Sequence, residues 1–195
     1  MVIIVTGTPG TGKTKVARFL SKALRYTYVD VHSLLRSKKL LSSYDNRRKC
    51  YVVDKTKLVK MLLKKVKTSE FSTKSVTGEL HKKTLTVLKN HSHAKRRMVV
   101  FDKSKKVVID SHLSHYLPKK YVELCIVTHC DIVVLKKRLE KRKYSQLKIR
   151  ENLDAEIFQT CLTEAQELGH QIIEVDTTKT FDKKKLLTKV KAWIS

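Results

Sequence analysis

Residues 7–14 constrain this 195-residue chain more than any other feature. They read GTPGTGKT, they follow the apolar run 2–6, and they lead into residues 13–24, where apolar side chains recur with a helical period. Glycines allow a backbone turn in which successive N–H groups point toward one centre, and the positive end of the following helix adds to that field. The pattern G-x-x-x-x-G-K-[ST] between a strand and a helix therefore predicts a phosphate-binding loop.

The residue types of this loop suit a nucleoside triphosphate. Lys13 is expected to reach the β- and γ-phosphates, and the hydroxyl of Thr14 is expected to bind Mg²⁺. Gly10 and Gly12 lie where the backbone has to approach the phosphates. The alternative is a glycine-rich turn that binds no ligand.

Short apolar runs alternate along the chain with longer stretches of helical period, which is typical of an α/β fold with a parallel sheet. The strand-like runs are 2–6, 26–29, 98–101, 107–110, 123–128 and 172–175. The helical stretches are 13–24, a turn through Leu34 and Leu35, 55–67, 132–141, one long helix over 146–168 that stops at Gly169, and 181–193. The length fits one domain over residues 1–195.

A carboxylate and a group of arginines indicate which reaction a bound nucleotide could undergo. Asp110 ends the apolar strand 107–110, which suits a partner for Mg²⁺ or its water shell, although an Asp there could also cap the next turn. Arg138, Arg142 and Arg150 lie close together around a predicted helix end, and phosphoryl transfer needs cations that neutralise developing charge. The chain has no N-K-x-D sequence, which disfavours a switch-type GTPase.

Cysteines and histidines do not indicate a metal centre. The four cysteines are scattered without a C-x-x-C pair, so we expect reduced thiols and neither a zinc ribbon nor a disulfide scaffold. The pairs His91/His93 and His112/His115 have no carboxylate or thiolate at ligand spacing. The sequence begins with a strand-like run and has no apolar stretch of the roughly 18–20 residues that span a bilayer, so a secreted or membrane protein is not expected.

The net charge of +25, from 43 Lys and Arg against 18 Asp and Glu, points to phosphate-bearing partners. Residues 60–106 contain 14 lysines and arginines but only three carboxylates. This stretch is either a patch that contacts RNA or a solvated basic insertion. Aromatic residues that could stack on bases are nearly absent from it.

Several motifs follow one another in a set order: GTPGTGKT at 7–14, Tyr44-Asp45 with YVVD at 51–54, DSHLSH at 110–115, and Arg138-Leu139 through Arg142, Tyr144, Lys148, Glu151-Asn152 and Ala155-Glu156. This order resembles the adenylate kinase isoenzyme 6 family, the small nucleoside monophosphate kinases of archaea and eukaryotic nuclei. The resemblance runs from Met1 to about Thr178, and the basic stretch before Met98 is its main unmatched part. The sequence DTT at 176–178 is closer to the archaeal branch.

The resemblance implies a three-layer P-loop NTPase fold with a parallel sheet, an arm for the monophosphate over about 30–53, a basic insertion over about 68–97 and a short lid over about 141–151. It implies that Gly10, Gly12, Lys13, Thr14 and Lys15 hold the ATP phosphates. Arg142 would reach over these phosphates from the lid. Asp110 and His112 correspond to a D-x-H pair beside the γ-phosphate and Mg²⁺, and the loop at 177–180 would pass the adenine.

Two residues depart from the family pattern. Lys15 follows the loop threonine where the family usually has a second Thr, so a charge replaces a hydroxyl there. Lys143 stands in the lid where the family usually has Gly in the sequence R-G-Y. Glycine adopts a positive φ freely, whereas a lysine in that position is strained if the turn requires such an angle.

The resemblance implies transfer of the ATP γ-phosphoryl group to AMP, giving two ADP, with Mg²⁺ as cofactor and an ATPase side activity. It also implies a role in small ribosomal subunit maturation, with contacts to a ribosomal protein and rRNA, in a monomer of the cytoplasm, or of the nucleus in a eukaryote. The rival hypothesis is an ATP-driven ribosome assembly factor whose kinase activity is vestigial. A basic nucleic-acid-binding module with an inactive loop is a more distant alternative.

Overall fold

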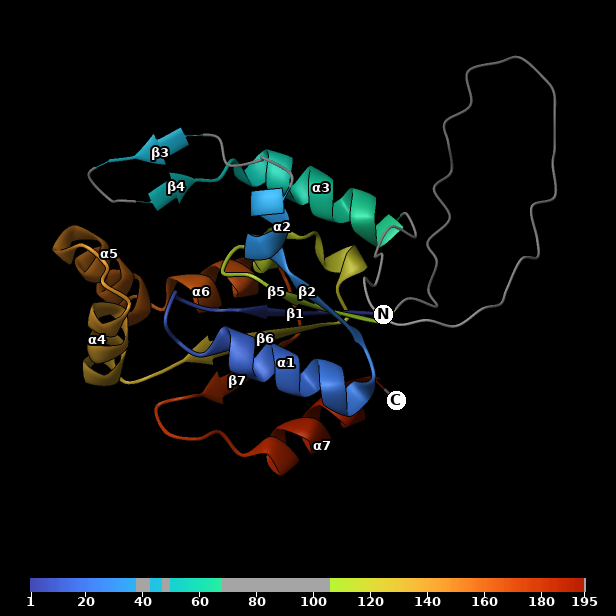
Figure 1. Ribbon diagram of the computed structural model, residues 1–195. Helices are drawn as coiled ribbons and strands as arrows, with labels where there is room; N and C mark the ends of the chain where they lie inside the picture. The colour runs from blue at the N-terminus through green and yellow to red at the C-terminus, as the bar shows by residue number, and fades with distance from the viewer. Residues whose placement is uncertain (38–42, 47–49, 68–105, 195) are drawn as a thin grey trace, which may run out of the picture.

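The computed structural model describes residues 1–37, 43–46, 50–67 and 106–194 (Figure 1). Its strands are β1 (Val2–Thr6), β2 (Thr27–Asp30), β3 (Ser43–Asp45), β4 (Cys50–Val52), β5 (Val107–Asp110), β6 (Leu124–His129) and β7 (Ile172–Asp176). Its helices are α1 (Lys13–Leu24), α2 (Val31–Ser37), α3 (Lys55–Lys67), α4 (Ile132–Lys141), α5 (Gln146–Ile157), α6 (Thr160–Glu167) and α7 (Lys183–Ile194), with short 3₁₀ turns η1 (Ser114–Tyr116) and η2 (Lys119–Tyr121).

Five parallel strands form the central sheet in the order β2-β5-β1-β6-β7. Strand β1 lies in the middle, and all five of its residues are buried, as its unbroken apolar run predicts. Because the strands are parallel, their carboxyl ends share one edge, where Val5 pairs with Asp110 and Thr6 pairs with Val127. The expected α/β fold with a parallel sheet is therefore confirmed.

Helices cover both faces of this sheet and complete the three layers (Figure 1). On one face, Ile3 and Val5 of β1 pack with residues of α1 and α7. On the other face, Val2 and Ile4 pack with residues of α2, α3 and α6. The alternation of side chains along one buried strand thus supplies both cores.

The prediction of one long helix over 146–168 is wrong, because this segment forms two helices, α5 and α6. Gln159 adopts a left-handed conformation, with φ of 50°, directly before α6. The two helices have different partners: Ile149 of α5 packs against α4, whereas Ala165 of α6 packs into the core on the sheet. One straight helix could not make both contacts, and the helical period of the sequence does not reveal this corner.

Other boundaries move by one or two residues from those expected, as β2, β7 and α7 show. The residues expected to form the arm, 30–53, contain α2 and the antiparallel pair β3–β4. The strand expected at 98–101 and the basic insertion at 68–97 lie outside the described residues. Within the described ranges, the structure contains no helix with the length and apolar character that a membrane span requires.

Candidate active site

The phosphate-binding loop connects the buried strand β1 to the start of α1. Gly7 has φ of 135°, and a Cβ atom there would lie 2.2 Å from the carbonyl oxygen of Thr128, so only glycine fits. At Gly10 the loop passes close to α4. A Cβ atom added there would lie 2.7 Å from Leu135 Cδ1, so this position also requires glycine. Gly12 directly precedes α1, and no side chain caps this helix N-terminus. The first N–H groups of α1 are therefore available to an anion.

Lys13 lies over the loop that precedes it. Its ammonium group donates hydrogen bonds to the carbonyl oxygens of Gly7, at 2.8 Å, and Thr8, at 2.9 Å. Burial lowers the pKa of Lys13 to about 8, although the carboxylate of Asp110 acts in the opposite direction. Lys13 is thus still mostly protonated at pH 7, and an incoming phosphate would stabilise its charge.

Two threonines from outside the loop support it, Thr128 on β6 and Thr177 directly after β7. The Thr11 hydroxyl is 2.7 Å from the hydroxyl of Thr128, and the Thr177 hydroxyl donates to the carbonyl oxygen of Thr11. Arg138 in turn donates to the carbonyl oxygen of Thr177 at 2.6 Å. Arg138 is therefore engaged in holding the segment after β7. The sequence gives no local signal for Thr128, which is 117 residues away from its partner.

Asp110 is the last residue of β5, and His112 follows it two residues later at the same edge of the sheet. Asp110 is buried, and its Oδ2 accepts a hydrogen bond from the hydroxyl of Tyr28 at 2.8 Å. Burial and this carboxylate together raise the pKa of Tyr28, so its phenol stays protonated. The ring of His112 is open to solvent, yet partial desolvation and the charges of Lys13 and Lys148 lower its pKa. His112 is therefore neutral at pH 7 and can exchange hydrogen bonds without adding charge.

The expected lid residues lie at the turn between α4 and α5. Arg142 directly follows α4 and is exposed, and its charge contributes to the low pKa of Lys13, which places it within electrostatic range of the loop. Lys143 has φ of 58°. The turn therefore does require the left-handed angle that glycine adopts freely, and lysine occupies it at a cost of roughly 1 kcal/mol or more.

The remaining predicted site residues are less enclosed. Thr14 and Lys15 both lie in the first turn of α1 with exposed side chains. The structure thus brings Asp110, His112 and Arg142 each within electrostatic range of Lys13. It leaves Lys15 at the solvent-facing start of the helix.

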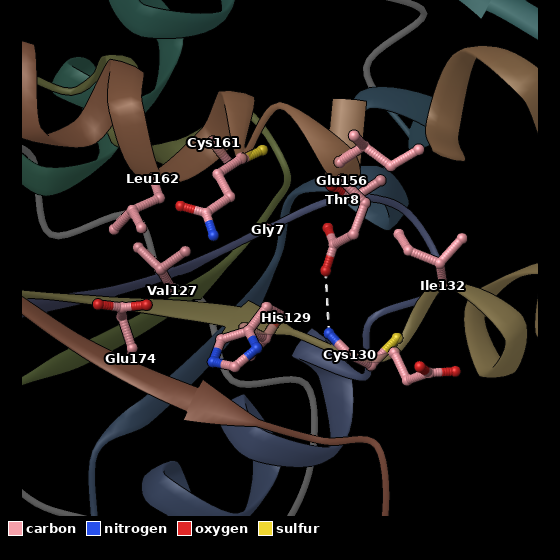
Figure 2. Close-up of a pocket in the computed structure, with 14 residues that line it drawn as sticks. Gly7, Thr8, Val127, His129, Cys130, Ile132, Glu156, Cys161, Leu162 and Glu174 are labelled. Carbon is pink, nitrogen blue, oxygen red and sulfur yellow. Dashed lines mark hydrogen bonds between the residues drawn. The ribbon is translucent and has the colours of Figure 1, made fainter. Parts of the chain in front are cut away.

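A pocket of about 390 Å³ is lined by Gly7 and Thr8 of the loop, by the end of β6 and by residues near the corner between α5 and α6 (Figure 2). The carboxylate of Glu156 accepts a hydrogen bond from the backbone N–H of Cys130 at 2.9 Å, which ties α5 to the end of β6. Burial raises the pKa of the Cys161 thiol, which lines this pocket together with Gly7 and Thr8. The contact of Glu156 with Cys130 is not apparent from the sequence.

A chain of buried polar contacts runs under the same loop. The Thr6 hydroxyl lies 2.8 Å from Nδ1 of His115, and Nε2 of His115 lies 2.8 Å from a carboxylate oxygen of Glu164. The other oxygen of Glu164 accepts from Tyr116, whose hydroxyl also receives a hydrogen bond from Lys55 at the start of α3. Because a carboxylate only accepts, Nε2 of His115 carries the proton. These contacts link the residue before Gly7 to the helix that follows the arm.

The donors near the loop fit Mg²⁺. Asp110 Oδ1 accepts no hydrogen bond from the residues that the structure describes, and the side chain of Thr14, in the first turn of α1, is exposed. In those same ranges, no group of three or more His, Cys, Asp or Glu side chains could hold a metal alone. Mg²⁺ is typically held by one or two protein oxygens together with substrate phosphates and water, so this sparse donor set suits it.

The parallel sheet, the glycine-rich loop and the carboxylate at the end of the neighbouring strand define a P-loop kinase, an enzyme that transfers a phosphoryl group. The shikimate kinase of Acinetobacter baumannii has the same fold, with a TM-score of 0.56 at 14% identity over 99% of this chain and 92% of that one. The AAA domain family matches residues 3–159.

Closer relatives specify the kind of kinase. The adenylate kinase isoenzyme 6 homolog of Dictyostelium discoideum is 30% identical over 194 residues, which cover 98% of this chain and 90% of that protein. A Methanosarcina mazei protein with an adenylate kinase name is 33% identical over 179 residues, which cover 91% of this chain and 79% of that protein. The chain belongs to the adenylate kinase isoenzyme 6 family, and the resemblance stated from its motifs is confirmed.

Proposed function

We propose that the chain transfers the γ-phosphoryl group of ATP to AMP, giving two ADP. The observation that carries this proposal is the grouping of Lys13, Asp110, His112 and Arg142 around the uncapped start of α1. The relatives' names support an adenylate as the substrate. The choice of AMP as acceptor is our own extension of those names.

The reaction needs positioning and charge neutralisation more than covalent chemistry. The phosphate oxygen of AMP attacks the γ-phosphorus of ATP, and the bond from that phosphorus to the bridging oxygen of ADP breaks. The loop N–H groups and Lys13 would hold the β- and γ-phosphates, and Arg142 would add positive charge as the lid closes. His112, being neutral, would orient a phosphate or a water by hydrogen bonding.

Thr14 and Asp110 would hold Mg²⁺, either directly or through its water shell. When bound, the ion would supply positive charge that offsets the negative charge of the phosphates. Asp110 is buried and already fixed through Oδ2, so it can present Oδ1 without reorganising.

A coupled assay that tracks ADP and free phosphate separately tests the proposal. With ATP, Mg²⁺ and AMP, we expect two ADP for each AMP consumed and little phosphate. The Lys13→Ala variant should lose at least about 100-fold in rate, as expected when one donor to the transferred group is removed. Lys22→Ala, an exposed lysine at the other end of α1, is the matched control and should retain the wild-type rate. Full activity of Lys13→Ala would show that the site is assigned wrongly.

We also propose an ATPase side activity and a role in small ribosomal subunit maturation. The net charge of +25 supports work on a particle rich in RNA phosphate. Phosphate release that is indifferent to AMP, and stimulated when small ribosomal subunits are added, would favour an ATP-driven assembly factor with vestigial kinase activity. ADP formation that depends strongly on AMP, with little phosphate released whether or not ribosomal subunits are added, would favour the kinase alone.

A further inference from the structure

A tyrosine on β2 contacts the carboxylate on which the proposed metal site depends. Strands β2 and β5 pair in parallel, with Tyr28 opposite Val108 and Asp30 opposite Asp110. Val108 packs in the core on the α1 side of the sheet, and Tyr28 packs against the same core. Asp110 lies two residues after Val108, so its side chain projects from that face too, toward the helix that carries the phosphate-binding loop.

Three elements fix the geometry of this contact. The Tyr28 hydroxyl donates to Asp110 Oδ2 at 2.8 Å. From α1, the guanidinium group of Arg18 lies 5.5 Å from the centre of the Tyr28 ring, and this contact restrains the ring. Arg18 is five residues after Lys13, so the same helix carries the loop lysine and the restraint on Tyr28.

The two oxygens of the Asp110 carboxylate differ in their hydrogen bonds. Oδ2 of Asp110 accepts from Tyr28, whereas Oδ1 accepts from none of the described residues. A carboxylate held through one oxygen keeps a single orientation, and the other oxygen then faces a cation or its water in that orientation only.

We infer that Tyr28 is a positioning residue for Asp110: its hydroxyl holds the carboxylate with Oδ1 directed at the divalent cation of the bound nucleotide. This inference rests on the proposed function for the role of Asp110 at the metal. It gives a residue of the edge strand β2 the role of orienting the Asp110 carboxylate. Strand β2 contributes neither to the phosphate-binding loop nor to the end of β5.

The test uses the full chain and the probe Mn²⁺, whose binding is followed by electron paramagnetic resonance in the presence of ADP. Tyr28→Phe keeps the ring and removes the hydroxyl. We expect it to weaken Mn²⁺ binding to the protein–ADP complex about 10-fold, the lower end of what loss of a ligand-orienting hydrogen bond costs. Binding of metal-free ADP, measured with a chelator present, should stay within about twofold, because the loop and Lys13 are untouched.

Tyr26→Phe is the matched control. Tyr26 also packs against the core on the α1 side, but its hydroxyl donates to the sulfur of Met1 at the far end of the strands. It should leave Mn²⁺ binding at the wild-type value. If Tyr28 had a purely structural role, Tyr28→Phe would weaken the binding of metal-free ADP and of metal-bound ADP equally. That result would overturn the inference.

Asp110→Asn separates this inference from the proposed function. If Asp110→Asn weakens Mn²⁺ binding and Tyr28→Phe does not, the positioning role fails while the metal assignment stands. If Asp110→Asn keeps the wild-type Mn²⁺ affinity, the metal assignment fails and the positioning role fails with it. Weaker Mn²⁺ binding in both variants supports the inference whatever the acceptor of the phosphoryl group proves to be.

Discussion

The face of the sheet under α1 and α7 is packed mainly with apolar side chains, whereas the face under α3 and α6 also carries a chain of polar contacts that runs from the buried Thr6 to the exposed Lys55. Ile3, Val5 and Leu20 on the first face are fully buried. On the second face, Thr6 and His115 are equally inaccessible but are hydrogen-bonded to each other. Apart from the contact of Tyr28 with Asp110 at its edge, the first face therefore contributes mainly stability, and the second also holds the end of β1 where the phosphate-binding loop begins.

The largest effect should come from the face under α1 and α7. Leu20→Ala removes a fully buried side chain and leaves a cavity between α1 and the sheet, so we expect a loss of about 3 kcal/mol in the free energy of unfolding. Urea denaturation measures this loss. Lys22→Ala on the same helix is exposed and should change the free energy by less than about 0.5 kcal/mol. An equally small change in Leu20→Ala would contradict the assignment of stability to this face.

A smaller loss is expected when the polar chain is cut at its centre. Glu164→Ala leaves Nε2–H of His115 and the hydroxyl of Tyr116 without their acceptor, which should cost about 2 kcal/mol in urea unfolding. Glu167→Ala, exposed on the same helix, is the control. If the two variants are equally stable, the buried polar contacts do not stabilise the fold and the contrast between the faces is lost.

The polar face should also make stability depend on pH. Burial lowers the pKa of His115 below its usual 6.5, and the charges of His170 and Lys55 act in the same direction, while Glu164 opposes them. The unfolded chain therefore binds a proton that the folded chain does not. Stability should fall as pH drops below about 6.5, by up to about 1.4 kcal/mol per pH unit for this group. His115→Gln should flatten the slope between pH 7 and pH 5.5, and an unchanged slope would assign the effect to other groups.

The smallest effect is expected at the exposed start of α3. Lys57 and Asp54 form an ion pair of 3.8 Å with side chains that are 68% and 39% exposed. Lys57→Ala should change the free energy of unfolding by less than about 0.5 kcal/mol, and salt should remove even that difference. A larger loss in urea unfolding would mean that α3 depends on surface charge and not only on Leu58 and Leu62, which are buried beneath it.

The sequence predicts well what is local and periodic. The phosphate-binding loop, β1, α1, α3 and α4 lie where the patterns place them, because each depends on neighbours a few residues away. The corner at Gln159 was not predicted, because helical period continues through it while the tertiary partners change. Contacts such as Thr6 with His115, or Tyr28 with Asp110, join residues 109 and 82 positions apart. Only the parallel pairing of strands brings these side chains together, so no local pattern could identify them.

The site residues themselves divide in the same way. Lys13, Thr14 and Asp110 were predicted from motifs that combine residue type with a strand or helix end. Their supports, Thr128, Thr177 and Tyr28, are common residue types whose importance lies in where the fold places them. No sequence pattern identifies such a hydroxyl, because its hydrogen-bond partner is far away along the chain.

The helices α4 and α5 have an apolar cluster of their own, formed by Cys130, Leu135, Leu139 and Ile149. It is separate from the two cores on the sheet, and α4 meets the phosphate-binding loop at Gly10, against which Leu135 and Leu139 lie directly. The cluster holds the two helices together as one unit, and Glu156 and Arg138 tie that unit to the ends of β6 and β7. Arg142 lies at the turn where the two helices meet, so the α4–α5 unit, and neither core on the sheet, sets the position of this charge relative to the loop.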